Sequence, residues 1–135
     1  MPQTSARGTN RVIGLCLLCL LVAGCRSSSS VDVTIAPEVE PQPPRVGQVT
    51  IILRVTDSFG KPYTAARVRL EGNMSHAGMV PVFADAPEVF PGRYRANMEL
   101  TMAGDWVVLV KITFPGGEKV DRQFPITVSN AEGVR

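Results

Sequence analysis

The sequence predicts an all-β fold, an antiparallel sandwich of about seven strands that follows a signal peptide and a flexible tether. From Gln48 onward apolar and polar residues alternate with a period of two, the spacing of strands that bury one face. Segments rich in glycine, proline and aspartate separate the alternating runs. No window of about a dozen residues has the apolar spacing of a helix.

The alternating runs cover residues 31–35, 49–55, 68–70, 94–100, 106–114 and 120–128. The run 106–114 is the most apolar, so we expect it to be a central strand with Trp106 as a core anchor whose indole N–H needs a partner. Turn residues predict connections at 57–62, at 87–92, before Trp106 and at 115–118. Short strands at this spacing are typical of an immunoglobulin-like sandwich.

The N-terminus is predicted to be a targeting segment. Arg7 and Arg11 precede an apolar run, Val12 to Ala23, that is too short to span a bilayer as a helix and suits a secretory signal. The run ends in small residues before Cys25, which resembles the bacterial lipobox. Cleavage there would leave Cys25 as the lipidated first residue. The alternative is an ordinary signal peptide cut near Gly24, with Cys25 incidental.

We therefore expect a signal peptide at 1–24, a lipid anchor and Ser/Pro-rich tether at 25–46, and a sandwich domain at 47–130. Cys16 and Cys19 have the Cys-x-x-Cys spacing of a redox or metal motif, but they lie in the apolar run and would be discarded with it. The remaining chain would have no disulfide and would depend on core packing.

One segment, 73–79, departs from the alternation and contains the only histidine of the chain, His76. Met74 and Met79 lie on either side of it, and thioether and imidazole donors suit Cu(I). If residues 74–76 are extended, Met74 and His76 point to one face, and Gly78 permits a bend that returns Met79 toward them. Met102, at the end of a strand, is a further candidate ligand.

A plainer interpretation of the same residues stays open. Methionine often fills sandwich cores, and Met98 shares the register of Tyr94 and Leu100, so we expect Met98 in the core. A single loop histidine is commonly just solvated.

Three features in order resemble the YtkA-like family, which is related to the periplasmic part of FixH proteins. They are Asp57-x-x-Gly60-Lys-Pro followed by Ala66-x-Val68; Met74-x-His76-x-Gly78-Met79; and Gly92-x-Tyr94 continuing to Met102-Ala-Gly104-Asp-Trp106. The resemblance covers about residues 45–128. It implies an immunoglobulin-like sandwich outside the cytoplasm and a role in copper handling, often linked to the assembly of haem–copper oxidases. By this resemblance, Met74, His76 and Met79 match the family's Met/His segment, and Met102 matches the methionine before the Gly-x-Trp. FixH proteins have a transmembrane helix where this chain has a predicted lipid anchor.

The leading hypothesis is therefore an extracytoplasmic lipoprotein on a bacterial membrane, on the periplasmic face if the cell is Gram-negative. It would bind Cu(I) and store it or deliver it, as a metallochaperone, to a membrane protein. The alternative is a structural or interaction module without metal. We expect no enzyme, because no nucleophile elbow, phosphate-binding glycine loop or paired-carboxylate motif is present. The net charge of +2 without a basic cluster argues against a nucleic-acid partner.

Overall fold

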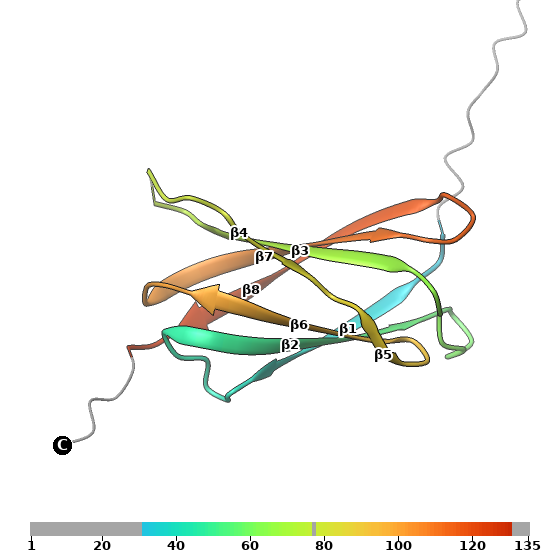
Figure 1. The fold of residues 1–135 in the computed structure, drawn as a ribbon, viewed down its shortest axis with the longest axis horizontal. Helices are drawn as coiled ribbons and strands as arrows, with labels where there is room; N and C mark the ends of the chain where they lie inside the picture. The colour runs from blue at the N-terminus through green and yellow to red at the C-terminus, as the bar shows by residue number, and fades with distance from the viewer. Residues whose placement is uncertain (1–30, 77, 131–135) are drawn as a thin grey trace, which may run out of the picture.

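The computed structural model describes residues 31–76 and 78–130 as a sandwich of two four-stranded antiparallel sheets (Figure 1). One sheet has the order β1-β2-β6-β5 and the other the order β4-β3-β7-β8. The strands are β1 (Thr34–Glu40), β2 (Gly47–Thr56), β3 (Arg67–Met74), β4 (Val82–Asp85), β5 (Glu88–Phe90), β6 (Arg93–Leu100), β7 (Gly104–Thr113) and β8 (Lys119–Val128). The predicted fold class is confirmed. The predicted signal peptide and Cys25 lie outside the described residues.

The apolar residues of the alternating runs form the two inner faces of the sandwich. Along β2 every second side chain, from Val49 to Val55, is fully buried, and β6 and β7 follow the same rule. β7 is a central strand, as predicted, and Trp106 is among the largest buried side chains. Met98 is also buried, which confirms its assignment to the core. No buried side-chain nitrogen or oxygen lacks a hydrogen-bond partner among the described residues.

The structure departs from the predicted strands at the sheet edges. Residues 87–92 were expected to be a turn, but they contain β5, which pairs with β6 through Glu88 opposite Tyr94 and Phe90 opposite Arg93. Pro87 and Pro91 flank the pairing rather than interrupt it. With β4 and β5 both formed, the described chain has eight strands.

β1 lies in the segment 25–46, which the sequence analysis assigned to the anchor and tether. It pairs with β2 from Thr34 opposite Thr56 to Glu40 opposite Thr50. Pro37 is tolerated within it because an edge strand has one side free of ladder hydrogen bonds. The described residues contain no helix long and apolar enough to cross a membrane.

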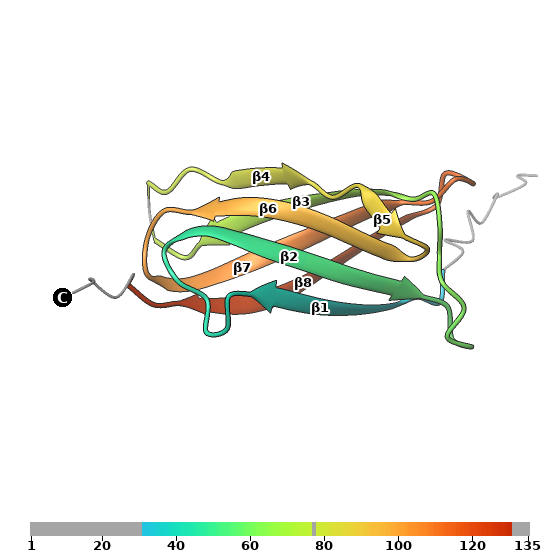
Figure 2. The same cartoon turned by 60° about the horizontal axis from the view of Figure 1, so that its bottom comes forward.

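The connections gather at two opposite ends of the sandwich (Figure 2). We call one the histidine end; it holds the β1–β2, β3–β4 and β6–β7 connections (41–46, 75–81 and 101–103). We call the other the entry end; it holds the β2–β3, β5–β6 and β7–β8 connections and residues 31–33, where the described chain enters β1. β2 runs the length between them, about 30 Å for its ten residues.

Candidate metal site at the histidine end

Met74 is the last residue of β3 and reaches across to the start of β7. It lies opposite Trp106 in the register of the two strands and packs, partly buried, against the core. A Cβ atom built on Gly104 would lie 2.9 Å from the Met74 Cε, so the methionine methyl occupies space that the bare glycine leaves free. The end of β3 and the start of β7 are therefore in contact, immediately after the β6–β7 connection.

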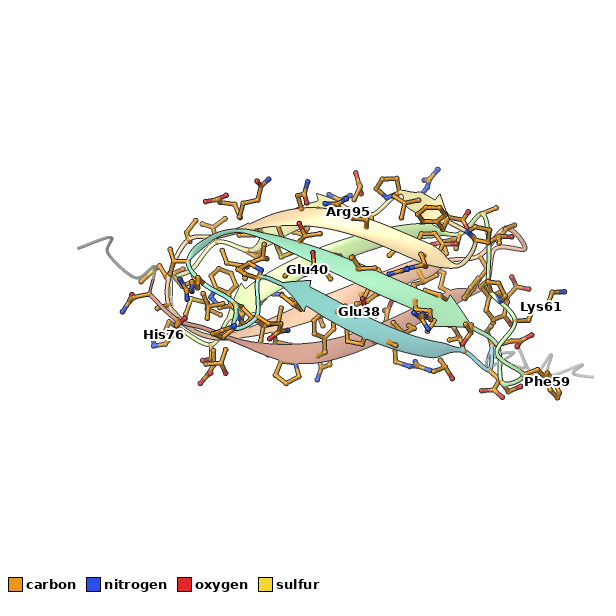
Figure 3. All side chains as sticks on the ribbon, turned by 90° about the horizontal axis from the view of Figure 1, so that it is seen from below. Glu38, Glu40, Phe59, Lys61, His76 and Arg95 are labelled. Atoms are coloured by element: carbon orange, nitrogen blue, oxygen red, sulfur yellow. The ribbon has the colours of Figure 1, made fainter. Side chains whose placement is uncertain are left out.

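His76 lies in the β3–β4 connection with its side chain exposed. Figure 3 shows it at one end of the molecule, beyond the last paired residues of the strands. The condition under which Met74 and His76 would share a face, an extended segment 74–76, is not met, because the strand ends at Met74 and the chain bends at Ser75 and His76. The pairing of β3 with β4 stops at Gly72 opposite Val82, so nothing on that side holds the chain straight. Met74 packs inward, whereas His76 faces solvent.

Met79 follows a tight turn, as the sequence analysis expected of Gly78. The Met79 N–H donates to the His76 carbonyl oxygen at 3.4 Å, and Gly78 has a φ of +86°, a conformation that favours glycine. Met79 is partly exposed. This turn keeps the backbone of His76 and Met79 close together at the tip of the connection.

Met102 lies in the β6–β7 connection, and its side chain is 50% exposed. Its carbonyl oxygen accepts a hydrogen bond of 3.0 Å from the Trp106 Nε1–H, so the buried indole holds the backbone beside Met102 in place. This bond supplies the indole partner that the sequence analysis required. Met74, at the end of β3, thus contacts Gly104, which stands two residues after Met102 in the sequence.

Met98 is the fourth methionine of the described residues near this end, and its side chain is buried. Its sulfur would lie 3.0 Å from a Cβ on Gly72, and Trp106 packs against the same position at 3.6 Å. Sequence reasoning missed the glycines. Gly104 makes room for Met74, and Gly72 makes room for Met98. The only sequence signal for this role is that each glycine occupies a position in a run where every second residue is otherwise apolar.

No group of three or more histidine, cysteine, aspartate or glutamate side chains that could hold a metal occurs within residues 31–76 and 78–130. The donors gathered at the histidine end are thioethers and one imidazole, which is the soft set that Cu(I) prefers. A groove of about 940 Å³ lies elsewhere, at the entry end between the start of β3 and the β7–β8 hairpin. Its lining includes Arg67, Arg69 and Thr113 but none of the four predicted ligands.

The comparison with solved structures concerns the fold alone. The adhesin FdeC of Escherichia coli has a similar structure, with a TM-score of 0.51 and 20% identity, over 75% of this chain and 32% of the adhesin. The soluble domain of PmoD from Methylocystis sp. ATCC 49242 (Rockwell) aligns with a TM-score of 0.48 and 14% identity, over 72% of this chain and 90% of that domain. Murine CRIg aligns with a TM-score of 0.43 and 13% identity, over 73% of this chain and 99% of that one.

The family is defined by sequence. The YtkA-like family model matches residues 27–111, and the chain belongs to this family. The matched segment contains Met74, His76, Met79 and Met102. No curated protein matches the chain.

Proposed function

We propose that this YtkA-like domain binds Cu(I) at the histidine end, with Met74, His76, Met79 and Met102 as ligands, and that it stores the ion or delivers it to a membrane protein. The observation that carries the proposal is the contact of the Met74 methyl with Gly104, which places Met74 beside the start of β7, two residues after Met102. Storage and delivery require binding and release, and no catalytic step.

The chemistry of the four side chains fits such a role. A thioether is a soft, neutral donor that binds without losing a proton and does not form disulfides, which suits an oxidising compartment. The imidazole of His76 is exposed and Met102 is half-exposed, so an incoming or receiving protein would have access to them. The backbone beside each donor is anchored, by the turn between His76 and Met79 and by the Trp106 bond to Met102.

The experiment is a competition titration of Cu(I) against a chromophoric chelator, with a protein of residues 26–135. We expect the wild type to retain a single Cu(I) and the double variant His76→Ala with Met79→Ala to lose it. Met98→Leu is the matched control, because it removes a buried thioether that takes no part in the proposed site. A double variant that competes for Cu(I) as well as the wild type would refute the ligand assignment.

We also propose that the chain is anchored outside the cytoplasm by a lipid on Cys25, on the periplasmic face if the cell is Gram-negative. Mass spectrometry of the protein from a bacterial membrane fraction tests this. The expected product begins at Cys25 and carries acyl chains, and Cys25→Ser moves the protein out of that fraction. An unmodified chain cut at Gly24 would contradict the anchor and leave the copper proposal untouched.

A module that binds a protein partner without metal is the second candidate, and one observation favours it. Val80 and Phe83 are large exposed apolar residues on and beside β4, close in sequence to His76. Under the copper proposal, Val80→Ser leaves Cu(I) affinity unchanged and the His76/Met79 double variant abolishes delivery to a receiving protein. A partner complex that Val80→Ser disrupts, and that forms equally with and without Cu(I), would favour the second candidate.

A further inference from the structure

The most exposed large apolar side chain of the described residues is at the entry end. Phe59, in the β2–β3 connection, is 95% exposed. A locked turn presents it: one Asp57 carboxylate oxygen accepts hydrogen bonds from the N–H of Phe59 at 2.9 Å and of Lys61 at 2.8 Å. The Asp57 N–H donates to the Lys61 carbonyl oxygen at 2.9 Å, and Gly60, with a φ of +81°, closes the loop. The turn therefore holds the ring away from the core in a defined place.

A second apolar group lies at the same end. Val89 and Phe90, on and at the end of β5, are both exposed. The β5–β6 connection that follows them is tied to the end of β2, just before the β2–β3 connection, because the Val55 N–H donates to the Gly92 carbonyl oxygen at 2.8 Å. A Cβ on Gly92 would lie 2.5 Å from the Pro62 Cβ, so the two connections are in direct contact. Phe59 and Phe90 thus belong to one end surface.

The chain itself enters the sandwich at this end. Thr34, the first residue of β1, lies opposite Thr56, the last residue of β2, and Asp57 follows at once. The residues before Thr34 in the sequence include the run of serines and Cys25. A lipid on Cys25 would therefore be joined to the sandwich through the entry end, nine residues before Thr34.

The positive charge of Lys61, in the β2–β3 connection, suits a phospholipid surface. Lys61 forms no ion pair within the described residues, and the neighbouring Asp57 carboxylate is engaged by the amides of its own turn. An aromatic ring with a lysine two residues away matches the composition of membrane–water interfaces, where rings enter the headgroup region and amines meet phosphates.

We propose that the entry end lies on a phospholipid bilayer, with Phe59 inserted at the headgroup boundary and Lys61 at the phosphates. The histidine end then points away from the membrane, about 30 Å along the strands. Figure 3 shows Phe59 and Lys61 together at the end opposite His76. The proposal deepens the proposed lipid anchoring and assigns an orientation to the copper-binding end.

The experiment reproduces the tether chemically, so that its outcome does not depend on acylation in the cell. In a protein of residues 25–135, Cys25 is the only cysteine, and its thiol couples to a maleimide lipid in phosphatidylcholine–phosphatidylglycerol vesicles. Phe59→Trp adds an exposed indole at the proposed contact, and Val80→Trp adds a matched exposed indole at the histidine end. The native Trp106 is buried and provides the common background.

We expect the emission of Phe59→Trp to shift to the blue on coupling and to lose intensity when the lipids carry brominated acyl chains. Val80→Trp and the wild type should show neither change. Equal quenching of the two variants, or quenching of neither, would overturn the proposal. So would a wild-type dimer in solution that Phe59→Ser dissociates, since a second copy would then cover the ring. Cu(I) titration of Phe59→Trp should match the wild type, so a failure of either proposal is visible without the other.

Discussion

The indole N–H of Trp106 donates a hydrogen bond of 3.0 Å to the carbonyl oxygen of Met102. One partner is a core side chain and the other is the backbone of the β6–β7 connection, which carries a proposed copper ligand. The core thereby sets the position of a surface connection at the histidine end.

Replacing the indole tests this link. Trp106→Phe removes the hydrogen bond and buried volume, and we expect the free energy of unfolding to fall by about 1–3 kcal/mol. Urea unfolding followed by circular dichroism measures the loss. Met102→Leu is the control, because it keeps the carbonyl oxygen and should leave stability nearly unchanged while weakening Cu(I) binding. Equal stability of Trp106→Phe and the wild type would show that the bond contributes nothing.

Gly104→Ala tests the contact between Met74, at the end of β3, and the start of β7. The new Cβ would meet the Met74 methyl, and the φ of +132° is strained for alanine, so we expect a loss of about 1–3 kcal/mol. Gly47→Ala is the control for strain alone, since Gly47 has a φ of +117° and nothing within 4 Å of its Cβ position. Only Gly104→Ala should also change Cu(I) affinity. The same affinity in both variants would remove Met74 from the site.

Tyr94 ties β6 to the β2–β3 connection. Its hydroxyl donates to the Tyr63 carbonyl oxygen at 2.8 Å and accepts from the Ala66 N–H at 3.1 Å. Tyr94→Phe leaves both backbone groups without this partner, so we expect the free energy of unfolding to fall by about 1–3 kcal/mol at neutral pH. Thermal or urea unfolding measures it. An unchanged midpoint would mean that water replaces the hydroxyl at no cost.

The same residue predicts a pH dependence. Burial raises the pKa of Tyr94, the Ala66 N–H acts against this, and the negative charge of Glu88 adds to it. The contribution of the neutral hydroxyl is fully present below the unfolded pKa of 10.0 and is lost as pH rises through the higher folded value. We expect wild-type stability to fall more steeply than that of Tyr94→Phe above pH 10. Parallel alkaline unfolding curves would contradict this.

Glu71 and Lys111 form a cross-strand ion pair at 2.8 Å on the outer face of the β3–β7 pair. The hydrogen bond from Lys111 lowers the pKa of Glu71, with a second bond from Asn73, against a small opposing effect of burial. Stability from this group is present above the unfolded pKa of 4.5 and is lost as pH falls through the lower folded value.

Lys111→Met should therefore cost about 0–1 kcal/mol at neutral pH, and the difference from wild type should vanish in acid. The longer and more exposed Arg69–Asp85 pair, at 4.0 Å, is the control, and Asp85→Asn should cost less. Acid unfolding of both variants measures the difference. A gap between Lys111→Met and wild type that persists at low pH would point to lost packing of the lysine stem instead.

The local pattern of the sequence was enough to predict much of the fold. The inward positions of β2, β6, β7 and β8 follow from alternation alone, and so does the burial of Met98 and Trp106. β5 could not be found in this way, because its three exposed residues have no pattern and it exists through pairing with β6. The bend at Ser75 was missed because it depends on where β4 stops pairing.

The candidate site, too, could be predicted from the sequence only in part. Sequence composition identified the thioether and imidazole donors, because their chemistry does not depend on the fold. The meeting of Met74 with Gly104 depends on the register of β3 with β7, and the bond between Trp106 and Met102 forms where the buried indole lies at the start of β7.

By itself, then, the sequence determined the all-β class, the residues of the core and the types of donor available, since each follows from local periodicity or side-chain chemistry. Only the tertiary structure decided which connections share an end, and so set His76 apart from Phe59 at opposite ends of the sandwich. The physical reason is that the ends are defined by contacts between strands distant in the chain, whose register no local pattern contains.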